Sequence, residues 1–111
     1  MPTTLPVAVP DQEESTDTEH LHAPRYHVIL FDDDSHTYEY VIEMMVVLFA
    51  MTVEQGFEIA YEVDHIGQAI VMTVPHAEAL EARQKIITYG ADPRMPGSTG
   101  SMGCMIQKAE A

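Results

Sequence analysis

Residues 26–35 read YHVILFDDDS, a run rich in β-formers that passes directly into a polar, acidic segment. Short apolar runs with β-branched and aromatic residues, bounded by polar residues, are typical of buried strands. We therefore expect a strand over residues 26–31 and a turn over residues 32–35. The rest of the chain is interpreted outward from this strand and turn.

Two helices are predicted directly after this turn. The first, at about residues 37–49, has apolar side chains at helical spacing on one face: Val41, Met44, Met45, Leu48 and Phe49. Thr52 and Gln55 have the spacing of a capping box, which starts a second helix at about residues 53–63. Its expected apolar face consists of Phe57, Ala60, Tyr61 and Val63. The methionines at 44, 45, 51 and 72 are expected to fill the core.

A strand, a helix and a last strand complete the predicted order. Residues 69–74 read AIVMTV and form the second strand, and Pro75 suits the start of a helix at about 76–89. Residues 92–103 are rich in Gly, Pro and Ser and form a loop, after which residues 104–107 form a short strand. The order β-α-α-β-α-β predicts the α+β class, a compact domain with a small antiparallel sheet packed on helices.

Composition divides the chain into a tail and one domain. Residues 1–24 contain prolines and acids but no Lys or Arg, which predicts a flexible, disordered tail, and residues 25–111 form the core domain. The formal net charge of −13 disfavours nucleic acid and anionic lipid and favours cationic partners. A single cysteine, no visible signal peptide and no long apolar run lead us to expect a monomer in the cytoplasm.

The acidic turn and the Asp64-His65 pair are the features that could carry chemistry. Because successive strand residues point to opposite sides, the three carboxylates of the turn are not expected to converge, and a solvated turn is the plainer interpretation. A metal-dependent enzyme could use Asp32, Asp33, His36, Asp64 and His65, although no common metal-binding spacing is present. Cys104 has no basic neighbour placed by spacing, so nucleophilic catalysis has less support still.

Several motifs, taken in order, resemble the ClpS family. The resemblance begins at residues 26–34 (YHVILFDDD) and continues through YEYVIE, TVEQG and EVDHIGQA to the closing CMIQKA, which ends at Ala109. It implies an adaptor, not an enzyme, that needs no cofactor. Such an adaptor binds proteins with a bulky hydrophobic N-terminal residue, the N-degron, and delivers them to the Clp ATPase ClpA or ClpC for degradation by ClpP.

The resemblance also implies a site. Carried over by position, the α-amino group of the substrate is held by Asp32, Asp33 and Asp64. The side-chain pocket is formed by His36, Tyr38, Val41, Ala60, Val63 and Met102. Glu78 and Arg83 keep the spacing of the residues that dock on the N-terminal domain of the ATPase.

Five departures from the family pattern make this a divergent member. Asp32 stands where the family has Asn, Asp64 where it has His, and Ala60 where it often has Met. His36 stands where Thr precedes the first helix, and Thr is the better cap. The loop at 92–101 is longer. A ClpS-fold protein whose pocket has drifted to another N-terminal residue is therefore the alternative interpretation.

Overall fold

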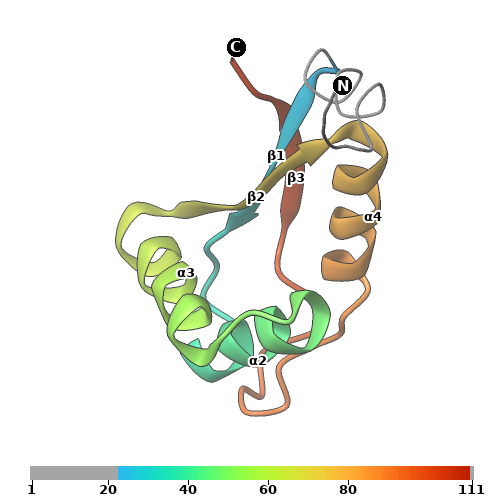
Figure 1. Ribbon diagram of the computed structural model, residues 1–111. Coiled ribbons are helices and arrows are strands. Elements are labelled where there is room, and N and C mark those ends of the chain that lie inside the picture. The colour runs from blue at the N-terminus through green and yellow to red at the C-terminus, as the bar shows by residue number, and fades with distance from the viewer. Residues whose placement is uncertain (1–22, 111) are drawn as a thin grey trace, which may run out of the picture.

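The computed structural model describes residues 23–110, so residues 1–22 of the expected tail lie outside it. The elements follow in the order β1 (Arg25–Phe31), α2 (Tyr38–Phe49), α3 (Val53–Ile66), β2 (Gln68–Pro75), α4 (His76–Ile87) and β3 (Cys104–Lys108). The strands form one antiparallel sheet in the order β2-β1-β3. In Figure 1, α4 lies along one side of the sheet, while α2 and α3 lie beyond its lower end. The predicted α+β class is confirmed.

Element boundaries differ from the prediction by a few residues at the helix ends. Helix α3 continues to Ile66 and ends at Gly67, whose φ of 102° favours glycine. The capping box of Thr52 and Gln55 is present. The expectation that His36 precedes the first helix as its cap is wrong. Thr37 is the N-cap of α2, and its side chain accepts a hydrogen bond from the backbone N–H of Tyr40.

The core lies between β1 and the inward faces of the helices. Val28 and Leu30 on β1, together with Met44 and Met45 on α2, have no measurable solvent exposure. Burying an apolar side chain of this size stabilises the fold by about 1.5–3 kcal/mol. The expectation that methionines of α2 fill the core is therefore confirmed.

Helix α3 buries only part of the face that its sequence predicted, because Ala60 and Val63 are buried and Phe57 and Tyr61 are not. Its buried residues are Gly56, Ala60 and Val63, whereas Phe57 and Tyr61 are 47% and 51% exposed. The reason is the close approach of α2, because a Cβ atom on Gly56 would lie only 3.1 Å from the Cα of Ile42. Small residues fit at this crossing, and the two large aromatic side chains are left outside.

The end of β1 is held between two glycine-containing segments. The backbone N–H of Phe31 donates to the carbonyl of Gly103, and that of Asp32 donates to the carbonyl of Gly67, both at 3.0 Å. The second bond joins the acidic turn to the residue that ends α3. Asp32 is thereby brought to the same end of the molecule as Asp64, which precedes Gly67 by less than one helical turn.

Candidate functional site

A cavity of about 250 Å³ lies where the end of β1 meets α2 and α3. It is lined by Asp32, Asp33, Asp34, His36, Thr37, Tyr38, Val41, Ala60, Val63, Asp64 and Met102. All nine residues assigned from the sequence to the amine-binding group and the side-chain pocket are among them. Asp34 and Thr37 line the cavity as well and were not assigned. What these residues bind stays a prediction.

The three aspartates of the acidic turn all border one cavity, which strand alternation did not predict. Asp32, Asp33 and Asp34 all line the same cavity. Strand alternation does not apply to them, because β1 ends at Phe31 and the backbone turns directly after it. One carboxylate is used within the turn itself, since Asp33 Oδ1 accepts from the backbone N–H of Ser35 at 3.0 Å.

His36 is a fixed part of the cavity wall. Its side chain is only 3% exposed, and its Nδ1 lies 2.6 Å from Asp33 Oδ1. Its Nε2 lies 2.7 Å from the carbonyl oxygen of Gly100 and 3.3 Å from Ser98 Oγ. The imidazole ring is therefore held at both nitrogens, between the acidic turn and the loop at 88–103.

Tyr38 and Asp64 face each other across the cavity mouth. The hydroxyl of Tyr38 donates to Asp64 Oδ2 at 2.8 Å, and the Asp64 side chain remains 54% exposed. Loss of hydration, then the hydrogen bond and negative charge of Asp64, raises the pKa of Tyr38. The hydroxyl therefore stays protonated and fixes one carboxylate oxygen of Asp64 beside Val63 and Ala60.

The four aspartates that line the cavity, which we call the acidic rim, carry an unbalanced negative charge: Asp32, Asp33, Asp34 and Asp64. Loss of hydration and then the charge of Asp64 raise the pKa of Asp32, and Asp34 and Asp33 add to the effect. None of the five Lys and Arg residues, all of which lie within residues 23–110, lines the cavity. A positive group entering the cavity would relieve this repulsion, so the arrangement suits a cation.

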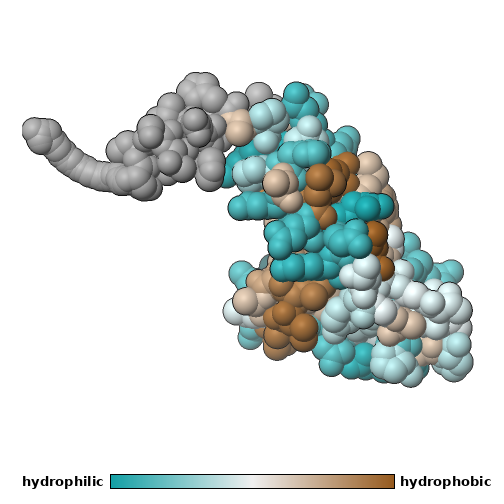
Figure 2. Space-filling model, turned by 90° about the vertical axis from the view of Figure 1, so that its right-hand side faces the viewer, coloured by the Kyte–Doolittle hydropathy of each residue, from teal (hydrophilic) through white to brown (hydrophobic). Residues whose placement is uncertain are grey.

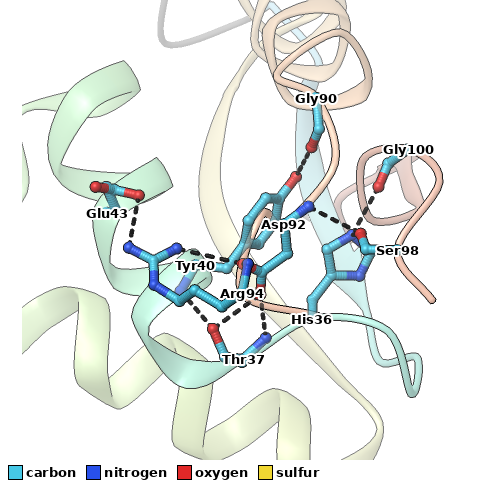
Figure 3. A network of polar contacts seen from close by, with 9 residues as sticks. All are labelled: His36, Thr37, Tyr40, Glu43, Gly90, Asp92, Arg94, Ser98 and Gly100. Atoms are coloured by element: carbon cyan, nitrogen blue, oxygen red, sulfur yellow. Dashed lines mark hydrogen bonds and ion pairs between the residues drawn. The ribbon is translucent and has the colours of Figure 1, made fainter. Parts of the chain in front are cut away.

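A buried carboxylate, that of Asp92, holds Thr37 of the cavity wall (Figure 3). Asp92 is 1% exposed, and its Oδ2 accepts from the backbone N–H and the hydroxyl of Thr37 at 2.7 and 2.8 Å. Its Oδ1 accepts from the backbone N–H and the guanidinium of Arg94 at 3.0 and 3.3 Å. Burial alone would raise the pKa of Asp92, but these four donors outweigh it and lower that pKa to about 2.

The same loop is attached to α2 and to itself at further points, and we call these contacts together with those of Asp92 the loop latch. Ser98 Oγ accepts from the backbone N–H of Asp92 at 2.8 Å, and the hydroxyl of Tyr40 donates to the carbonyl of Gly90. Arg94 also reaches Glu43 on α2 at 3.2 Å. The latch fixes the segment that supplies Met102, which is 2% exposed, to the cavity wall.

Sequence reasoning missed the loop latch. The dipeptide Asp92-Pro93 is a local turn signal, and an Asp side chain commonly accepts from the N–H two residues later, as Asp92 does from Arg94. That signal could have identified the Asp92 turn. Its second function, which is to hold Thr37 fifty-five positions earlier in the chain, has no local signature.

The two residues assigned to ATPase docking both lie on α4, but they leave the helix in different directions. A separation of five residues corresponds to about 140° around a helix. Glu78 is exposed and borders a shallow groove beside β2, whereas Arg83 Nε donates to the carbonyl of Cys104 on β3 at 3.1 Å. Figure 2 views this side of the molecule, where hydrophilic side chains surround smaller hydrophobic patches.

Cys104 and the acidic and histidine side chains are not arranged as reactive groups in the part of the chain that the structure describes. Burial raises the pKa of the Cys104 thiol to about 11, although nearby Arg83 opposes the shift. A nucleophilic cysteine has a lowered thiol pKa instead. Within residues 23–110, no group of three or more His, Cys, Asp or Glu side chains is arranged to hold a metal ion.

Comparisons with known proteins agree with the resemblance stated above. A family model described as "ATP-dependent Clp protease adaptor protein ClpS" matches residues 22–96, more than half of the chain. The ATP-dependent Clp protease adapter protein ClpS of Thermosynechococcus vestitus is 29% identical over 87 residues, which cover 78% of this chain and 90% of that protein.

A solved structure supports the fold separately. Agrobacterium tumefaciens ClpS2, in a structure bound to L-phenylalaninamide, matches with a TM-score of 0.68 at 18% identity, covering 79% of this chain and all of that one. In the part of the chain that the structure describes, none of the helices has the length and apolar character needed to cross a bilayer.

Proposed function

Because this chain belongs to the ClpS family of ATP-dependent Clp protease adaptors, we propose that it is an N-degron adaptor. It binds the free α-amino group and the bulky hydrophobic first side chain of a substrate protein. It then delivers that protein to a Clp ATPase, ClpA or ClpC, for degradation by ClpP. One observation carries the proposal: the cavity joins a carboxylate rim to an apolar wall.

The rim suits an N-terminal ammonium group. An ammonium group has three N–H donors and one positive charge, and hydrogen bonds between charged groups are roughly twice as strong as neutral ones. Asp32 and Asp64 can accept such bonds, while Asp33 already accepts from Ser35 and contacts His36. We therefore assign direct amine contact to Asp32 and Asp64, and we assign Asp33 to both amine binding and support of the wall.

The wall suits an apolar side chain. Val41, Ala60, Val63 and Met102 are each at most 4% exposed and line the cavity below the rim. An apolar cavity of about 150 Å³ holds a benzene molecule, so a cavity of about 250 Å³ has room for an aromatic first residue. The phenylalaninamide in the related ClpS2 structure is a ligand of this chemical type.

Peptide binding with and without a free amine tests this proposal. A fluorescent peptide that begins with Phe should bind, and N-acetylation of the same peptide should abolish binding. Asp64→Ala should weaken binding of the free peptide at least tenfold, whereas Glu81→Ala on α4, a matched loss of one exposed acid, should leave it unchanged. Equal binding of free and acetylated peptides contradicts the proposal.

Delivery is a separate step with its own measurement. Glu78 and Arg83 on α4 are the proposed contacts with the N-terminal domain of the ATPase, and Glu78 is the more accessible of the two. Glu78→Lys should slow degradation of a Phe-initiated reporter by ClpP with ClpA or ClpC, while peptide affinity stays at the wild-type value. Wild-type degradation rates with both ATPases would exclude Glu78 from docking.

The excess of acid on the rim favours a second candidate, a pocket that has drifted to another first residue. Asp32, Asp34 and Asp64 surround the mouth, and Ala60 leaves space where the family often has Met. A basic first residue would bring a second positive charge to this rim. A peptide array that varies only the first residue separates the two candidates, because preference for Lys or Arg over Phe and Leu would support the drifted pocket.

A further inference from the structure

The outer face of α3 carries a row of exposed ring and aliphatic side chains, which we call the α3 ladder: Phe57, Tyr61, His65 and Ile66. Ile66 is 71% exposed, and Phe57 and Tyr61 are about half exposed. The ring centroids of Phe57 and Tyr61 are 6.2 Å apart, and Tyr61 stacks on His65 at 3.9 Å. The ladder lines an apolar groove of about 420 Å³. Contiguous exposed apolar surface of this kind marks an interaction site.

The ladder is continuous with the cavity. Tyr38 lines the cavity and packs against Phe57, with ring centroids 5.7 Å apart. Asp64 lies on the cavity rim, and the next residue, His65, already belongs to the ladder. A chain whose first residue occupies the cavity therefore leaves it beside the groove.

The length of the groove fits a few residues of an extended peptide. At a rise of 1.5 Å per residue, the distance along α3 from Asp64 back to Phe57 is about 10 Å. An extended chain advances about 3.3–3.6 Å per residue. The ladder is thus about three residues long for a bound peptide, which corresponds to residues two to four after the N-terminal residue.

The negative charge around the groove limits which substrate side chains can bind there. Glu58 and Glu62 line the groove together with the ladder, and α3 contains no Lys or Arg. Aromatic faces attract a cationic side chain, and the two acids add to that attraction. An acidic side chain would meet repulsion from both.

We propose that the α3 ladder is a subsite for residues two to four of the substrate, where it selects apolar and basic side chains and disfavours acidic ones. The inference rests on the proposed N-degron function and deepens it. It gives this adaptor a preference beyond the first residue, through side chains that do not line the first-residue cavity.

Calorimetry with three ligands tests the subsite. Phenylalaninamide has no second residue, and the peptides Phe-Arg-Val-Gly-amide and Phe-Asp-Val-Gly-amide differ only in theirs. Wild-type protein should bind the Arg peptide three- to tenfold more tightly than the Asp peptide. Tyr61→Ala should remove most of that difference and leave the affinity for phenylalaninamide unchanged. Tyr61 is chosen because Phe57 supports Tyr38, so its removal would disturb the cavity.

Leu80→Ala on α4 is the matched control, because Leu80 is 46% exposed and lies outside the groove. It should change none of the three affinities. Wild-type binding that is insensitive to both the second residue and Tyr61→Ala overturns the subsite while leaving the N-degron proposal intact. Failure of all three ligands to bind overturns both. Self-association of the wild-type protein in sedimentation, lost in Tyr61→Ala, would instead assign the ladder to a second copy of the chain.

Discussion

Asp32 lines the cavity and Asp92 supports its wall through Thr37, and the environments of these two aspartates shift their pKa values in opposite directions. Asp92 is buried and receives four hydrogen bonds from Thr37 and Arg94, which lower its pKa to about 2. Asp32 stands on the rim, where loss of hydration and the charge of Asp64 raise its pKa. The surroundings of Asp92 are thus dominated by hydrogen-bond donors, and those of Asp32 by the negative charge of neighbouring carboxylates.

This difference separates a structural carboxylate from one suited to a ligand. A buried charge is stabilising only when donors compensate for its lost hydration. Asp92 meets that condition within the chain, and it fixes the loop that completes the cavity. Asp32 receives a backbone hydrogen bond from Asp33, but this bond does not outweigh its lost hydration and the charge of Asp64, so its pKa stays raised. An ammonium group from a substrate would supply further donors. The latch thus holds the cavity in shape, and the rim retains the charge that binding would neutralise.

Removing the charge of Asp92 should have the largest effect on stability. In Asp92→Asn, the amide keeps one acceptor oxygen, so some of the N–H and O–H donors of Thr37 and Arg94 lose their partner. We expect the free energy of unfolding to fall by about 2–3 kcal/mol. Urea denaturation measures this loss.

Asp32→Asn is the matched control for that measurement, because it makes the same chemical change on the rim. Its free energy of unfolding should be equal to the wild-type value or slightly higher, since a mutually repelling charge is removed. Equal losses in the two variants would mean that the two carboxylates do not differ as their surroundings indicate.

Acid should erase the stabilising effect of Asp92 over a defined range of pH. Its pKa is about 2 in the folded chain, against its ordinary value of 3.8. A carboxyl whose pKa is lowered by folding stabilises the fold above the unfolded pKa and loses that effect as pH falls through the folded pKa. The contribution is about 2 kcal/mol. Denaturation at pH 6, 4, 3 and 2 should show the wild type and Asp92→Asn converging below pH 4, whereas a constant difference contradicts the assignment.

Peptide binding should respond to pH through the other carboxylate. The pKa of Asp32 is raised, so acidification protonates it earlier than an ordinary aspartate, and its attraction for an ammonium group is lost. Affinity for a Phe-initiated peptide should therefore fall as pH is lowered from 7 toward 4. Asp32→Asn should bind about three- to tenfold more weakly at pH 7, because a charged hydrogen bond becomes neutral.

The same variant should also depend less on pH than the wild type does. Fluorescence polarisation across this range measures both effects. A variant that binds as tightly as the wild type at pH 7 would mean that Asp32 does not contribute to the amine contact.

The order of elements could be predicted from local signals, and nine of the residues that line the cavity could be predicted from the resemblance to the ClpS family. Hydrophobic runs mark the strands, Thr52 and Gln55 mark a helix start, and the motif order identifies the positions that line the cavity. The inward face of α3 could be predicted only in part, since Ala60 and Val63 are buried as expected but Phe57 and Tyr61 are not. Ala60 and Tyr61 are adjacent in sequence and both have apolar neighbours at helical spacing. Only the close approach of α2 at Gly56 decides between the two faces.

The loop latch could also be predicted only in part, for a related reason. Its local half is the turn of Asp92 and Arg94, which the sequence signals. Its other half joins Asp92 to Thr37, and this contact exists only after α2 and the loop have packed together. A long-range polar contact of this kind produces no periodic pattern of residues from which it could be predicted.

The outermost contact of the latch should have the smallest effect of all. Glu43 pairs with Arg94 at 3.2 Å, but its side chain is 52% exposed. Exposed ion pairs contribute roughly 0.2–1 kcal/mol, because water and salt screen them. Glu43→Gln should therefore lower the free energy of unfolding by at most about 0.5 kcal/mol, and added salt should remove the difference. A loss as large as that of Asp92→Asn would place the strength of the latch in its exposed ion pair and not in its buried carboxylate.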